Sequence, residues 1–228
     1  MRLQTYLIVD FDSTFVSVEA LDELAKIALR GAGDREQVVR QIETITRSAM
    51  VGEIGFAESL SGRLALFTPT DEQIRELTAF LMRHVSASVE ANKLFFQEHA
   101  VQIYIVSGGF KEYIVPVVSD FGISSDHVIA NTFTKSADGK IIGCDTANLM
   151  SQNNGKARSL EALGLEGKIV TVGDGYSDYQ TKAHGPSDVF IAYAENVSRK
   201  PVMSEADQVA WNFDDVVQEV DLSDKISV

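Results

Sequence analysis

The sequence has little cysteine, a deficit of basic residues and no long hydrophobic run. Its one cysteine, Cys144, excludes a disulfide within the chain and is typical of proteins from a reducing compartment. Asp and Glu total 33 against 20 Lys and Arg, and this net charge of −13 disfavours nucleic acids and anionic membranes as partners. No apolar segment approaches the roughly 20 residues that span a bilayer, and the N-terminus shows no signal-peptide pattern. We therefore expect a soluble cytoplasmic protein.

Short apolar runs alternate with helical patterns along the 228 residues, which suit one large domain or a domain with a modest insertion. Each run is followed by Asp, Ser, Asn or Gly, and the clearest helical patterns are 110–121 and 154–163. This alternation predicts an α/β fold, a doubly wound parallel sheet with helices on both faces. The predicted strands are 6–9, 103–106, 128–129, 169–172 and 189–192.

More than ninety residues separate the first two predicted strands, far more than one crossover helix requires. Apolar periodicity predicts helices in this insert at 21–28, 38–50, 56–66 and 74–84. Thr70 and Gln73 form a capping-box pattern ahead of the last helix. We predict that residues 17–86 form a small helical cap and that residues 1–16 and 87–228 form the core. Elsewhere, Asp138-Gly139 predicts a hairpin turn, and we expect the acidic segment 214–228 to be a frayed tail.

Two carboxylates, Asp10 and Asp12, follow the first predicted strand one residue apart. Open parallel sheets bind ligands at the carboxyl ends of their strands. There the first carboxylate could attack a phosphorus atom, and the second could give a proton to the departing oxygen. Because Asp, Ser and Thr also cap helices, this pair alone leaves the question open.

Two further clusters could bind an anion. Ser107-Gly108-Gly109 follows the second predicted strand and precedes a predicted helix. Its hydroxyl and glycine amides could form an anion-binding site at the helix N-terminus, or the segment could be a plain strand-to-helix turn. Lys156 lies in the first turn of a predicted helix, where its charge opposes the helix dipole. A bound phosphate would explain that placement, although most lysines are simply solvated.

Asp174 and Asp178 add two carboxylates after the fourth predicted strand, in the pattern Gly-Asp-Gly-x-x-Asp. Together with Asp10 and Asp12 they would repel one another unless a cation joins them. Mg²⁺ is the natural choice, because it takes carboxylates, waters and a phosphate oxygen as ligands. Turn chemistry is the alternative interpretation of this pattern.

The order of these motifs resembles the haloacid dehalogenase-like hydrolase superfamily. Asp10-Phe11-Asp12-Ser13-Thr14, with Glu19 five residues later, resembles its phosphoserine phosphatase branch, which carries a helical cap between its first two motifs. In that branch, residues of the cap line a pocket for the amino acid. The matching residues in this chain are Met50, Gly52, Phe56 and Arg63.

The resemblance implies a Mg²⁺-dependent phosphomonoesterase. Asp10 would be the nucleophile that forms an aspartyl-phosphate, and Asp12 would protonate the leaving alkoxide and later activate water. Mg²⁺ would be held by Asp10, the backbone carbonyl of Asp12, and Asp174. The presence of Asp12 favours a phosphatase or phosphotransferase over members that expel halide or pump ions, since those lack the second acid.

The same resemblance assigns the ligand contacts. Glu19 and Arg63 would take the ammonium and the carboxylate of L-phosphoserine, although an ion pair between two cap helices is an alternative for them. Ser107, the amide of Gly108 and Lys156 would bind the phosphoryl oxygens. Supporting positions are Thr14, Gly109, Ser177 and Asp178, the last of which would orient Lys156 or assist the metal shell.

Some choices stay open at this point. Ser177 stands where the branch usually has Asn, which puts the substrate in doubt more than the reaction. Another small phosphorylated metabolite, a phosphotransferase, and a non-catalytic module that binds phosphorylated metabolites remain alternatives. Tyr193 and Trp211 are expected to pack rather than to bind.

Overall fold

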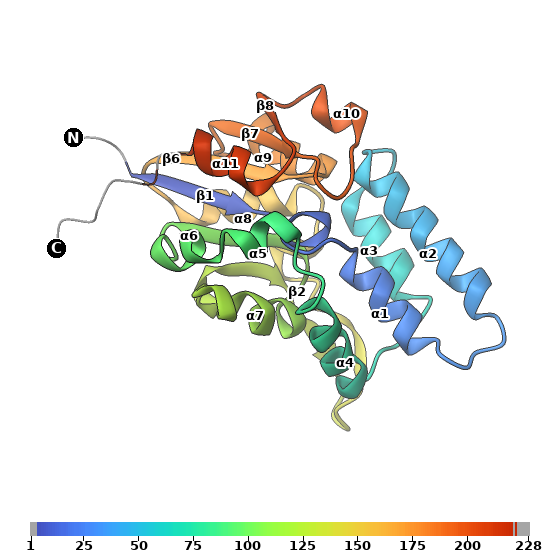
Figure 1. The fold of residues 1–228 in the computed structure, drawn as a ribbon. Coiled ribbons are helices and arrows are strands. Elements are labelled where there is room, and N and C mark those ends of the chain that lie inside the picture. The colour runs from blue at the N-terminus through green and yellow to red at the C-terminus, as the bar shows by residue number, and fades with distance from the viewer. Residues whose placement is uncertain (1–3, 221, 223–228) are drawn as a thin grey trace.

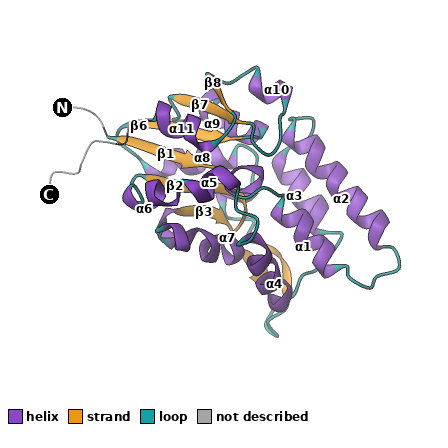
Figure 2. Cartoon of the chain, in the orientation of Figure 1, coloured by secondary structure: helices purple, strands orange, loops and turns teal. Residues whose placement is uncertain are grey.

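The computed structural model describes residues 4–220 and 222 of the chain. Within these residues, six parallel strands form one sheet in the order β3-β2-β1-β6-β7-β8, and β4 and β5 form a separate antiparallel hairpin (Figures 1 and 2). The strands are β1 (Thr5–Val9), β2 (Ile103–Phe110), β3 (Val128–Asn131), β4 (Phe133–Lys135), β5 (Ile141–Cys144), β6 (Lys168–Gly173), β7 (Val189–Tyr193) and β8 (Gln208–Ala210).

Helices cover both faces of this sheet (Figure 1). They are α1 (Ala20–Ala28), α2 (Arg35–Met50), α3 (Phe56–Leu64), α4 (Asp71–Leu81), α5 (Ala87–Ala91), α6 (Lys93–Glu98), α7 (Lys111–Val118), α8 (Gly155–Leu163), α9 (Tyr176–Ala183), α10 (Lys200–Met203) and α11 (Phe213–Glu219). The α/β doubly wound fold predicted from the alternating pattern is confirmed.

Alternate residues of the central strand β1 serve the two faces of the sheet, as a strand's period of two requires. Leu7 and Val9 pack into the larger apolar cluster, together with residues of α5, α6, α7 and α11. Ile8 points the other way and packs with Val106, Ile169 and Leu160 of α8. Burial on both faces explains why β1 is a continuous apolar run rather than an alternating one.

The long insert after β1 is helical, as predicted. Figure 1 shows α1, α2 and α3 standing beyond the arrowheads of the central strands, while α4 packs against α1 and α7. The capping box that opens α4 is present, because Gln73 N donates to Thr70 Oγ1 (3.3 Å) and Thr70 N donates to Gln73 Oε1 (2.9 Å). The exact limits of the cap, 17–86, stay a prediction.

Several boundaries differ from the sequence-based prediction. β2 continues through Ser107-Gly108-Gly109 to Phe110, because the chain pairs with β3 again after a register shift. Asp138-Gly139 does turn a hairpin, with Gly139 at φ 82°. The prediction of a frayed tail from residue 214 is wrong for α11, whose Phe213 and Val216 are fully buried; residues 221 and 223–228 lie outside the described part.

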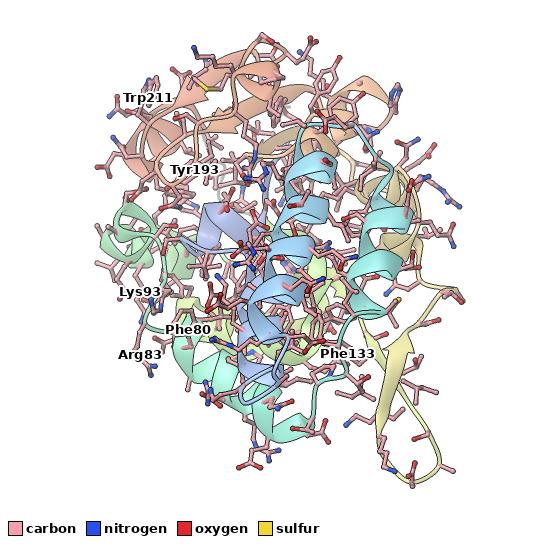
Figure 3. The ribbon with its side chains drawn as sticks, turned by 90° about the vertical axis from the view of Figure 1, so that its right-hand side faces the viewer. Phe80, Arg83, Lys93, Phe133, Tyr193 and Trp211 are labelled. Atoms are coloured by element: carbon pink, nitrogen blue, oxygen red, sulfur yellow. The ribbon has the colours of Figure 1, made fainter. Side chains whose placement is uncertain are left out.

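Two aromatic residues that were expected to pack behave differently (Figure 3). Tyr193 is 1% exposed and its ring is buried, as predicted. Trp211 is 57% exposed, so the prediction of packing is wrong for it. It follows the short strand β8, which was not predicted because three residues are too few to show a periodic pattern.

Candidate active site

Asp10 lies directly after β1 and is clamped at the centre of the sheet edge. Its backbone N–H donates to Val172 O of β6 (2.9 Å), and its own Oδ1 accepts from Phe11 N (2.7 Å). Lys156 Nζ lies 2.6 Å from the same Oδ1. With 6% of its surface exposed, Asp10 is held in one orientation by groups from three parts of the chain.

Lys156 connects Asp10 to a second buried carboxylate. Its Nζ donates to Asp178 Oδ1 at 2.6 Å, and Asp178 Oδ2 accepts from Gly175 N at 3.0 Å. Burial opposes the charge on Lys156, but the two carboxylates outweigh it and raise the lysine pKa. Burial and the charge of Asp10 raise the pKa of Asp178 to about 7. The lysine in the first turn of α8 is therefore a buried ion-pair partner and not a solvated surface group.

Gly173 is the residue that permits this close packing. A Cβ at this position would lie 2.2 Å from Cγ of Asp178, well inside van der Waals contact. The first glycine of Gly-Asp-Gly-x-x-Asp therefore lets α9 place the Asp178 carboxylate against the end of β6. Turn formation alone does not explain this motif.

Asp10, Asp174 and Asp178 can each offer a carboxylate oxygen to a common point, since these atoms lie within 4.8 Å of one another. All three residues are buried, and hard carboxylate oxygens are the ligands that Mg²⁺ prefers. Thr14 Oγ1 donates to Asp174 Oδ1 at 3.3 Å and fixes that side chain. The donor set fits a small divalent cation, with Asp178 as a candidate ligand beside the predicted Asp10 and Asp174.

Asp12 faces the pocket and is partly exposed to it. Its Oδ1 accepts from Ala20 N at 2.8 Å. Burial, and then the negative charges of Glu19 and Asp10, raise its pKa well above the usual range. This shift favours the protonated form, which can give a proton to a leaving group.

A cavity of about 290 Å³ lies between the sheet edge and α1–α3. Its size is at the lower end for small-molecule sites. Among the predicted residues, those that line it are Asp10, Asp12, Glu19, Met50, Gly52, Phe56, Arg63, Gly108, Gly109, Lys156 and Ser177. Thr14, Asp174 and Asp178 are buried and do not line it, and Asp178 holds the lining side chain of Lys156.

Ser107 is the predicted ligand-contact residue that does not line the cavity. It is fully buried, and its Oγ accepts a hydrogen bond from Gly109 N at 2.9 Å. In the described arrangement, this hydrogen bond lies within β2, where the pairing with β3 shifts register.

Glycines also let the helical insert approach the core. A Cβ on Gly108 would lie 2.5 Å from the ring of Phe56, and one on Gly52 would lie 2.9 Å from the ring of Tyr176. Asn153 adds a polar link, since its Oδ1 accepts from Ala57 N of α3 at 3.0 Å. These contacts between the helical insert and the core fix the position of the insert over the cavity.

Glu19 and Arg63, which both line the cavity, have separate partners. Glu19 Oε1 accepts from Ser13 Oγ (2.8 Å) and lies 3.3 Å from Nη2 of Arg199. Arg63 has Asp22 as its carboxylate neighbour. Within the described residues, no ion pair joins Glu19 to Arg63, whereas Arg63 does pair with Asp22 across two helices of the insert.

Sequence reasoning missed Arg199, whose guanidinium contacts the carboxylate of Asp174 as well as Glu19. A signal was available, because Arg199 comes six residues after β7, at the same sheet edge as the other motifs. Asn153, Asp22 and Thr46 were also missed, and they carry no spacing that distinguishes them from ordinary helix and loop residues.

The chain belongs to the haloacid dehalogenase-like hydrolase family, whose model matches residues 7–181. Phosphoserine phosphatase of Bos taurus is 34% identical over 212 residues, covering 92% of this chain and 88% of that protein. Phosphoserine phosphatase of Homo sapiens is 32% identical with the same coverage. A phosphoserine phosphohydrolase-like protein from Francisella tularensis subsp. tularensis SCHU S4 superposes with a TM-score of 0.84 at 28% identity, covering 96% of this chain and all of that one. Within the family, this chain is therefore a member of the phosphoserine phosphatase-like branch.

No described helix has the length and apolar character needed to cross a membrane.

Proposed function

We propose that the chain is a Mg²⁺-dependent phosphoserine phosphatase that converts L-phosphoserine to L-serine and phosphate. The observation that supports this most is the pair of unequal carboxyl groups in one cavity. Asp10 is held by Lys156, whereas the raised pKa of Asp12 favours its protonated form. Relatives named phosphoserine phosphatase, which align over most of the chain, support the choice of substrate.

In the first half-reaction, Asp10 acts as nucleophile. Its Oδ1 is occupied by Phe11 N and Lys156, so we assign the attack to Oδ2. The Oδ2–phosphorus bond forms while the bond from phosphorus to the seryl oxygen breaks. Asp12 gives its proton to that oxygen, and serine leaves as a neutral alcohol.

In the second half-reaction, Asp12 acts as a base. Its carboxylate takes a proton from a water molecule, whose oxygen attacks phosphorus. The bond to Asp10 Oδ2 breaks, and inorganic phosphate and the free Asp10 carboxylate are restored. Asp12 is protonated again at the end of the cycle, which is the state favoured by its environment.

The remaining charges hold the phosphoryl group. Lys156 and the amide of Gly108 would bind phosphoryl oxygens, and Ser107 would join them if its hydroxyl turned from Gly109. Asp10, the carbonyl of Asp12 and Asp174 would hold Mg²⁺, with Asp178 close by. The bound ion would neutralise phosphoryl charge as it develops.

The helical insert, 17–86, would act as the substrate-binding cap. Glu19 would bind the ammonium group and Arg63 the carboxylate. Met50 and Phe56 would form an apolar part of the cavity wall. Ser177 lines the same cavity, where its short side chain would contact the phosphate through water. We further propose a cytoplasmic location, with which the free thiol of Cys144 agrees.

A phosphate-release assay over a panel of metabolites tests this proposal. The panel holds phosphoserine, phosphosugars and phosphocholine, each with Mg²⁺ and with a chelator. We expect the highest kcat/KM for phosphoserine, loss of activity with chelator and recovery on adding Mg²⁺. A different ester preferred by about tenfold or more would overturn the substrate, and full activity with chelator would overturn the metal requirement.

Alcohols added to the same assay separate the alternative reaction. A phosphatase releases one phosphate for each serine formed, whatever alcohol is present. A phosphotransferase would release less phosphate than serine and would yield a phosphorylated alcohol.

A further inference from the structure

Arg63 is a buried cation whose direction is fixed by three helices of the insert. It lies on α3, is 6% exposed and lines the cavity. Its Nε donates to Ser59 O at 3.3 Å, and its Nη1 donates to Thr46 Oγ1 of α2 at 3.3 Å. The same Nη1 lies 3.9 Å from Asp22 Oδ1 of α1.

Thr46 joins the cation to the carboxylate. Its hydroxyl donates to Asp22 Oδ1 at 2.7 Å, which leaves the oxygen lone pairs to accept from Arg63. A hydroxyl has one proton to give, so the direction of this chain of hydrogen bonds is determined. Asp22, Thr46 and Arg63 thus form one connected polar group inside the insert.

Neither Asp22 nor Thr46 lines the cavity, and both are buried, at 6% and 4% exposure. A buried carboxylate lowers stability unless its partners compensate for lost hydration. Here the compensation is incomplete: burial raises the Asp22 pKa to about 6 against the hydrogen bond from Thr46, and Glu19 and Glu43 raise it further despite Arg63. An apolar residue would fill this position at lower cost, so stability does not account for the carboxylate.

We infer that Asp22 and Thr46 are positioning residues that hold the guanidinium of Arg63 at the cavity, where it receives the carboxylate of the substrate. This inference rests on the proposed function, because it deepens the role given there to Arg63. It places part of the selectivity for amino-acid phosphates in residues that do not touch the substrate.

A comparison of phosphoserine with phosphoethanolamine, which lacks only the carboxylate, isolates this role. We expect Asp22→Asn and Thr46→Val to raise KM for phosphoserine about tenfold, with kcat within about twofold. Both variants should leave kcat/KM for phosphoethanolamine unchanged. In an Arg63→Met background, which keeps the apolar stem of the side chain, Asp22→Asn should have no further effect.

Two matched controls accompany these variants. Thr46→Ser keeps the hydroxyl and should restore the wild-type KM. Ser59→Ala removes a buried hydroxyl on the helix of Arg63 that has no hydrogen-bond partner among the described residues. It keeps the carbonyl to which Nε donates, and the variant should behave as wild type. Equal losses on both substrates, or full additivity with Arg63→Met, would overturn the inference.

Side-chain NMR of Arg63 provides a readout that does not depend on turnover. The Nε–H of Arg63 should exchange slowly in the wild type and at least tenfold faster in Asp22→Asn and Thr46→Val. If the wild type failed to hydrolyse phosphoserine but this difference were observed, the substrate would be wrong while the positioning of Arg63 stood. Unchanged exchange in both variants would overturn the positioning role itself.

Discussion

The sheet edge and the helical insert face each other across one cavity but are built on different principles. At the sheet edge, Asp10, Lys156 and Asp178 form a continuous series of contacts of 2.6 Å, fixed by strand ends and a close approach at Gly173. In the insert, Arg63 is held by longer contacts of 3.3 to 3.9 Å from separate helices. Under the proposed function, the short contacts hold the groups that would carry the chemistry, and the longer ones hold a group that would carry recognition.

The largest effect is expected at the sheet edge. Asp10→Asn keeps the shape of the side chain but removes the nucleophilic carboxylate, so phosphate release should fall by roughly 10⁴-fold or more. The thermal unfolding curve should stay cooperative, because the amide can still accept from Phe11 N. Turnover near the wild-type value in a folded variant would contradict the assignment of Asp10, and with it the sheet edge, to the reaction.

A single added methyl group at two sheet glycines, one facing Asp178 of the edge and one facing Phe56 of the insert, sharpens the comparison. Gly173→Ala would push the Asp178 carboxylate away from Lys156, and we expect kcat to fall about 10²-fold. Gly108→Ala would meet the ring of Phe56 instead, which would displace the insert and raise KM about tenfold.

Steady-state kinetics on both alanine variants check this division. A Phe56→Leu change should partly recover KM in the Gly108→Ala background and should do nothing for Gly173→Ala. If both alanines changed kcat and KM alike, the two sides of the cavity would not have separate roles.

The smallest effect is expected in the pH dependence of stability, and it belongs to the insert. Asp22 has a pKa of about 6 in the folded chain against an ordinary 3.8, so the folded state binds its proton more tightly. The resulting stabilisation is fully present below about pH 4 and is lost as pH rises past 6. Between pH 4.5 and 7.5, the loss is roughly 2 kcal/mol.

Urea unfolding of the wild type and of Asp22→Asn over this pH interval measures that loss. The free energy of unfolding of the variant, relative to the wild type, should rise by about 2 kcal/mol from pH 4.5 to 7.5. A constant difference would mean that Asp22 does not titrate in this interval.

The features that the sequence predicts well are those determined by residues close together in the chain. The capping box at Thr70 and the turn at Asp138-Gly139 use residues whose chemistry acts within four positions. The acids at strand ends are also predictable, because the carboxyl ends of parallel strands share one edge.

Features set by tertiary contact were not predictable. β2 runs on through Ser107-Gly108-Gly109 because β3 pairs with it again, and within this stretch the Ser107 hydroxyl accepts from Gly109 N. The place of Arg199 after β7 indicates the sheet edge, but its contact with Glu19, 180 residues away along the chain, is set by the tertiary fold. The partnership of Asp22 with Arg63 depends on how α1, α2 and α3 pack.

The central claim is that Asp10 becomes covalently phosphorylated during turnover. Rapid acid quenching of the enzyme with phosphoserine and Mg²⁺, followed by borohydride reduction of any acyl phosphate to an alcohol, marks the residue that carried the phosphoryl group. Peptide mass spectrometry should find the reduced side chain at position 10, and Asp10→Asn should give none. Turnover with no reduced residue, or with the mark on Asp12, Asp174 or Asp178, would contradict the account.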